Sequence, residues 1–107
     1  MVRVYDAVYD KDREVGADGM IKALSSTVDL DTATYTNTVG SAELIGVWED
    51  PDFVPGQPAV YYVRVLEIPT PRWTLYDKVR YGLDDLSVNI PLTIQERAYT
   101  SAIWLIP

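Results

Sequence analysis

The most regular alternation of side chains in this sequence runs over Val60–Ile68, inside the stretch AVYYVRVLEIPTPRW at residues 59–73. Valine and tyrosine are enriched in strands, and successive side chains of a strand point to opposite faces. The residues expected on one face are Tyr61, Val63 and Val65. Because Pro69 and Pro71 each remove a backbone donor and fix φ, the strand is expected to pass into a stiff, extended loop.

Other segments between turn signals also have the composition of strands. The further segments expected as strands are Val2–Tyr9, Met20–Leu24, Thr32–Val39, Ser41–Trp48 and Glu96–Ile106. A hairpin-type turn is expected at Asp18-Gly19. One short helix is expected over Thr74–Tyr81, because Thr74 can cap its start and Gly82 can end it.

Several strands and one short helix, within 107 residues, predict an all-β fold: a single antiparallel β-sandwich domain over residues 1–107. Val60–Ile68 and Arg97–Ile106 would form its last hairpin, with Pro69–Glu96, including the helix, as an insertion before the last strand. Tyr61, two residues before Val63, fits the tyrosine corner of immunoglobulin-like domains, and an ordinary strand with a tyrosine pair is the alternative. The residues expected to be buried are Leu44, Trp48, Tyr61, Val63, Val65, Ile103 and Trp104.

The composition argues against several kinds of partner and catalytic site, and it says little about the fold. The net charge of −7 comes from residues 1–57, which hold 11 of the 16 acidic residues and 4 of the 9 basic ones, and this argues against nucleic acid or an anionic membrane as partner. The chain has no histidine and no cysteine, so it lacks the commonest zinc ligand and the usual general base, and a serine triad is excluded. No run of 18 apolar residues is present, so no membrane span is expected. We therefore expect no cofactor and no catalytic residue.

Two Asp-x-Asp pairs, Asp29 with Asp31 and Asp50 with Asp52, lie in expected loops. Calcium prefers several carboxylate and carbonyl oxygens, but no complete calcium-loop signature surrounds either pair. Aspartates also cap turns through their own side chains. Turn capping is therefore expected, with a structural calcium site as the alternative.

The proline-stiffened loop and the helix that follows it carry the residue types that dominate interface energetics. The candidate interface residues are Arg72, Trp73, Tyr76, Asp77 and Tyr81. A stiff loop loses little conformational entropy on binding, which favours such a role. The alternative is that Trp73 covers the end of the sandwich while Arg72 pairs with Asp77 or Glu67.

Four segments together resemble a known family. They are TVDLDTATYTN (Thr27–Asn37), WEDPDF (Trp48–Phe53), YYVRVLEIPTPRWTLYD (Tyr61–Asp77) and IQERAYTSAIW (Ile94–Trp104). They are similar to the C-terminal part of a bacterial family catalogued as a domain of unknown function, whose longer members are similar to metal-dependent hydrolases of the PHP type. In those hydrolases the metal-binding histidines lie in an upstream catalytic domain, so the resemblance assigns no metal ligand to any residue of this chain.

The resemblance implies that the chain is the C-terminal accessory part of a longer protein. On this hypothesis it is not an enzyme on its own, and it braces the upstream catalytic domain of the same polypeptide. The alternative is a free-standing protein- or carbohydrate-binding module that uses an aromatic patch. A broad bare apolar face would favour the first, and a clustered aromatic platform the second.

Overall fold

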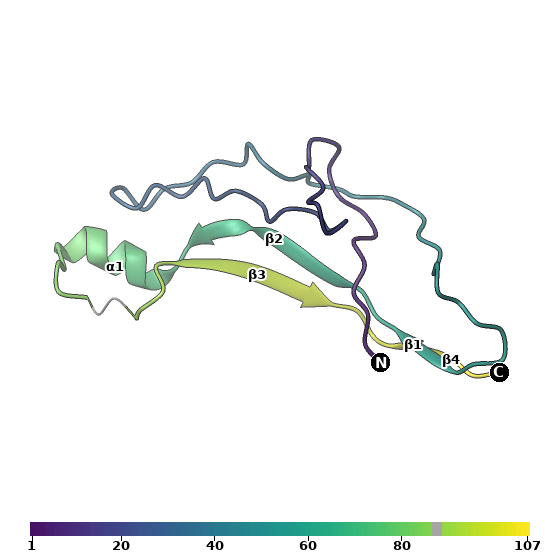
Figure 1. Ribbon diagram of the computed structural model, residues 1–107. Coiled ribbons are helices and arrows are strands. Elements are labelled where there is room, and N and C mark those ends of the chain that lie inside the picture. The colour runs from purple at the N-terminus through teal and green to yellow at the C-terminus, as the bar shows by residue number, and fades with distance from the viewer. Residues whose placement is uncertain (87–88) are drawn as a thin grey trace. The chain divides into compact units, whose positions relative to one another are not determined.

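The computed structural model describes residues 1–86 and 89–107, and their helix and strands all lie in the second half of the chain. The elements are β1 (Ala59–Tyr61), β2 (Arg64–Pro71), α1 (Trp73–Tyr81), β3 (Thr93–Tyr99) and β4 (Ile103–Leu105). Strand β1 pairs with β4, and β2 pairs with β3. The β1–β4 pair is antiparallel, and the arrows of β2 and β3 run in opposite directions (Figure 1). The regular elements of the described chain are therefore mostly strands, in small antiparallel sheets, with one short helix.

The predicted last hairpin is present, but each of its strands is divided in two. The register of the outer part pairs Ala59 with Leu105, Val60 with Trp104 and Tyr61 with Ile103. Between the two parts, the Thr100 amide donates to the Val63 carbonyl at 2.9 Å, and the Val63 amide donates to the Thr100 hydroxyl at 2.9 Å. The hydroxyl takes the place of a backbone carbonyl as acceptor. The backbone hydrogen-bond ladder is therefore interrupted here, while the two segments stay side by side.

The expectation that Pro69 and Pro71 begin a loop is wrong, because β2 continues to Pro71. In a two-stranded sheet each strand has one unpaired side, so a missing donor on that side costs no ladder hydrogen bond. Contact between the two strands continues one residue beyond β2, where the Arg72 amide donates to the Leu92 carbonyl at 2.9 Å. The part of Pro69–Glu96 outside the strands is thus shorter than predicted.

The strands predicted for the first half of the chain are absent from the described residues. The segments concerned are Val2–Tyr9, Met20–Leu24, Thr32–Val39 and Ser41–Trp48. Only isolated bridges join Val15 to Ile21 and Asp29 to Thr34. Alternation is compatible with an extended chain, but a strand also requires a partner for its backbone groups. The turn predicted at Asp18-Gly19 is present: Gly19 has φ of 79°, and the Gly16 amide donates to the Met20 carbonyl at 2.7 Å.

The chain divides into two compact units, each assembled from separated segments. Unit 1 comprises Met1–Lys22, Ser41–Val65 and Arg97–Pro107. Unit 2 comprises Ala23–Gly40 and Leu66–Glu96. Among the described residues the buried ones are Ala33, Pro71, Thr74 and Leu75, all in unit 2.

The core predicted from the sequence is wrong, since it falls on unit 1. Ile103 is 65% exposed and Trp104 is 70% exposed, Leu44, Trp48, Val63 and Val65 are also exposed, and Tyr61 is half-buried. The physical reason is that a two-stranded sheet covers little of its own side chains and needs a further layer to bury them. The single-domain, immunoglobulin-like sandwich stays a prediction.

Candidate interface on helix α1 and an aromatic cluster in unit 1

Helix α1 starts one residue earlier than predicted. Its N-cap is Arg72, in an extended conformation with no side-chain capping bond, and the Arg72 carbonyl accepts from the Leu75 amide at 2.9 Å. Thr74, the predicted cap, is instead buried, and its hydroxyl donates to the Pro91 carbonyl at 2.7 Å. The hydroxyl therefore ties the first turn of α1 to the segment that leads into β3. Helix α1 lies at the end of the β2–β3 pair (Figure 1).

The end of α1 matches the prediction. Gly82 adopts the left-handed conformation, with φ of 62° and ψ of 41°, and its amide donates to the Lys78 carbonyl. Glycine takes this conformation without the steric cost of a Cβ atom. Lys78 and Arg80 lie in the last turn, where cations interact favourably with the helix dipole.

The two sides of α1 differ sharply in exposure. Leu75 is fully buried, whereas Trp73 is 65% exposed and Tyr76 and Tyr81 are exposed as well. Because residues three, four, seven and eight positions apart lie on the same side of a helix, Trp73 shares its side with the other aromatic residues and with Asp77. The structure thus brings four of the five candidate interface residues together on one side of α1, with the three aromatic residues exposed and Asp77 half-buried.

Arg72 stands apart from that side. It precedes the helix, is half-buried, and its amide is engaged with Leu92. Among the described residues no ion pair joins it to Asp77 or Glu67. The exposure of Trp73 likewise gives no support to the alternative in which its ring covers an end of the fold.

Arg80 belongs to the same side of α1 and was missed in the sequence. Its guanidinium lies over the ring of Tyr81, 5.6 Å from the ring centroid, as in a cation–π interaction. The available signal was its position seven residues after Trp73. The exposed side of α1 therefore combines three aromatic rings with one cation stacked on a ring, an arrangement suited to binding by contact and stacking. It holds no nucleophile paired with a base.

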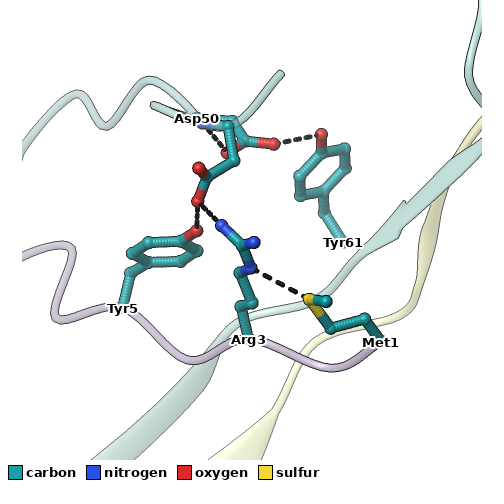
Figure 2. Close-up of polar contacts among 6 residues, drawn as sticks. Met1, Arg3, Tyr5, Asp50 and Tyr61 are labelled. Carbon is teal, nitrogen blue, oxygen red and sulfur yellow. Dashed lines mark hydrogen bonds and ion pairs between the residues drawn. The ribbon is translucent and has the colours of Figure 1, made fainter. Parts of the chain in front are cut away.

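A second cluster, in unit 1, joins residues distant in the sequence. Trp48 lies between two tyrosines, with ring centroids 5.1 Å from Tyr5 and 6.4 Å from Tyr61. The Tyr61 hydroxyl donates to Asp50 Oδ2 at 2.8 Å (Figure 2). A tyrosine corner would donate to an upstream backbone carbonyl, so the observed bond to a carboxylate is a different arrangement.

Asp52 completes this cluster on its other side. Arg3 forms an ion pair with Asp52 Oδ2, and the Tyr5 hydroxyl donates to the same oxygen. Figure 2 shows Arg3 and Tyr5 pointing toward the Asp50 turn from the N-terminal segment. The Arg3 hydrogen bond, followed by that of Tyr5, lowers the pKa of the Asp52 carboxyl. The carboxylate in turn raises the pKa of Tyr5, as Asp50 raises that of Tyr61.

Both Asp-x-Asp pairs cap turns. Asp29 Oδ1 accepts from the Asp31 amide at 2.8 Å and from the Thr32 amide at 3.2 Å, and these bonds lower the pKa of Asp29. Asp50 Oδ1 accepts from the Asp52 amide at 2.9 Å. In the part of the chain that the structure describes, no three acidic, histidine or cysteine side chains are placed to hold a metal ion.

Comparison with known proteins places this chain in a family but indicates no reaction. Within residues 1–86 and 89–107 no helix has the length and apolar character needed to cross a membrane. Comparison with curated proteins and with solved structures finds no match. The sequence model of one family, described as "Protein of unknown function (DUF3604)", matches residues 1–107. Since the match extends over the whole sequence, this chain belongs to the DUF3604 family.

Proposed function

We propose that this chain is a non-catalytic accessory domain that braces an upstream metal-dependent hydrolase module of the same polypeptide. The proposal extends the resemblance of three segments, WEDPDF, YYVRVLEIPTPRW and ERAYTSAIW, to hydrolases of the PHP type. On this proposal the metal ligands and the catalytic groups belong to the upstream module. The chain supplies an apolar surface that packs against it, and the immunoglobulin-like sandwich is the fold proposed for the assembled domain.

The observation that carries the proposal is the apolar surface left bare on the β1–β4 sheet. Val60 and Trp104 are directly paired, so their side chains lie on the same face, and Ile106 comes directly after β4. All three are exposed, and no charged residue occurs in either strand. Soluble monomers rarely leave large contiguous apolar patches uncovered, so this face fits a surface that a permanent partner covers.

The composition supports the non-catalytic part of the proposal. A chain without histidine and cysteine lacks the usual ligands of catalytic zinc and the usual general base. Among the aspartates of the two Asp-x-Asp pairs, the side chains of Asp29, Asp50 and Asp52 are engaged in capping turns or in bonds to Tyr5, Tyr61 and Arg3.

One observation favours the second candidate function, a free-standing binding module. Trp73, Tyr76 and Tyr81 are gathered on the exposed side of α1, on a helix that Leu75 anchors from the opposite side. A rigid row of aromatic side chains can stack against a sugar ring or a peptide without much loss of conformational entropy. On the accessory proposal the upstream module covers this side of α1 as well as the β1–β4 face, whereas on the second candidate function a ligand covers it.

The substitution Trp73→Ala separates the candidates. In a polypeptide that also carries the hydrolase module, we expect it to lower the melting temperature by about 2–4 °C for each kcal/mol of lost contact, with metal content unchanged. In the isolated chain, where the ring is exposed, the melting temperature should stay the same, and no ester hydrolysis is expected with added divalent metals. Val2→Ala, at another exposed apolar residue, is the control.

Two results would contradict the accessory proposal. The first is an unchanged melting temperature of the longer polypeptide, together with weakened binding of an oligosaccharide or peptide by the isolated Trp73→Ala chain; that result would establish the free-standing module instead. The second is metal-dependent turnover by the isolated chain that persists after removal of contaminating enzymes.

A further inference from the structure

The N-terminal segment, residues 1–9, is held in unit 1 through side chains. Among the described residues no backbone–backbone hydrogen bond involves this segment, and it contains no strand. Two of its side chains, Arg3 and Tyr5, meet at Asp52, and Asp6 Oδ2 accepts from the Ile21 amide at 2.7 Å. The segment lacks the cooperative ladder that would make its detachment costly.

What the segment covers is the aromatic cluster. The Tyr5 ring packs on Trp48, whose other neighbour is Tyr61 on β1. A short turn joins the two sides. Asp50 accepts a hydrogen bond from Tyr61 (Figure 2), and Asp52, two residues later, binds Arg3 and Tyr5 of the N-terminal segment. The ring contact therefore depends on a turn whose two carboxylates hold different parts of the chain.

We propose that residues 1–5, which precede the Asp6–Ile21 bond, form a releasable strap, fastened at Asp52 by Arg3 and Tyr5, that covers one face of Trp48. The contacts that fasten it are exposed to solvent, and exposed ion pairs contribute little to stability. The strap therefore opens locally, without unfolding of unit 1, and its opening uncovers the Trp48 ring beside Tyr61. The Asp50–Tyr61 bond stays in place during this opening, because it does not involve the strap.

The test follows the exposure of one tryptophan. In a Trp73→Phe and Trp104→Phe background, Trp48 is the remaining tryptophan of the chain. Adding Asp52→Asn removes the charge that fastens the strap, so we expect a higher acrylamide quenching constant and a red shift of the Trp48 emission. The midpoint of urea unfolding should not change. Glu14→Gln is the matched control, because it breaks the exposed Lys22–Glu14 ion pair of the same unit.

A second variant tests whether loss of one of the two donors has a smaller effect than loss of the carboxylate. Tyr5→Phe removes one of the two donors to Asp52 and leaves the ring in place, so it should raise the quenching constant less than Asp52→Asn. An unchanged quenching constant in Asp52→Asn would show that the strap is not fastened there. An equal rise in Glu14→Gln would show a general effect of charge. Loss of cooperative unfolding in Asp52→Asn would show that these contacts belong to the fold itself. Each of these three results would overturn the proposal.

Discussion

Truncation of Leu75 should destabilise unit 2 more than truncation of its neighbours on α1. Leu75 is the fully buried large side chain among the described residues. Leu→Ala in a buried site costs about 2–5 kcal/mol, from lost transfer free energy and from the cavity that remains. Few other apolar residues of unit 2 are buried, namely Ala33 and Pro71, so we expect the site to relax around the deletion. We therefore expect a value in the lower half of the range, about 2–3 kcal/mol.

The measurement is urea unfolding of Leu75→Ala, monitored by the fluorescence of Trp73 after Trp48→Phe and Trp104→Phe. A probe on α1 is needed because the two compact units need not unfold together, and a single global transition cannot be assumed. Val79→Ala is the control, since its side chain lies on the same helix but is 40% exposed. If Leu75→Ala cost no more than Val79→Ala, the assignment of Leu75 as the anchor of the helix would be refuted.

Two further predictions concern the backbone and a capping carboxylate. Gly82→Ala should destabilise α1 by about 1 kcal/mol, because φ of 62° is strained for alanine although no atom lies within 4 Å of the added Cβ; a loss near zero by urea unfolding would contradict the assigned C-cap. The lowered pKa of Asp29 means that its carboxylate stabilises the folded state above the unfolded pKa of about 3.9, and that this contribution is lost as the pH falls through the lower folded pKa. Asp29→Asn should therefore be less stable than the parent at neutral pH, with the difference closing in acid; a constant difference across that range of urea titrations would contradict the capping role.

The sequence predicted those elements whose causes are local. The end of α1 could be found because a left-handed glycine acts on the last carbonyls of its own helix. The last hairpin could be found because its first segment, Val60–Ile68, is rich in valine and tyrosine, which favour strands. Strands in the first half could not be judged in the same way, since an extended segment such as Ser41–Trp48 becomes a strand only when a partner lies beside it. The same limit applies to Pro71, because a proline is compatible with a strand whose donor side is unpaired.

The two candidate regions also differ in whether they could be predicted from the sequence. The exposed side of α1 could be found because helical spacing relates Trp73 to Tyr76 and Tyr81 within nine residues. The contact of Tyr5 with Asp52 spans 47 residues, and nothing in the sequence near either residue points to the other. Sequence patterns therefore identify a site on one element more readily than a site that the tertiary structure assembles.

On helix α1, the residue that stabilises the fold and the residue exposed for binding can be substituted independently. Its anchoring side chain, Leu75, and its exposed ring, Trp73, are two residues apart but lie on opposite sides of the helix. Loss of Leu75 acts on the packing of unit 2, whereas loss of Trp73 acts on whatever covers the exposed side. A change in binding or in domain association caused by Trp73→Ala, at unchanged stability of the isolated chain, can thus be attributed to the surface itself. The choice between an accessory domain and a free-standing binding module then depends on one side of one helix, where the two functions require different partners.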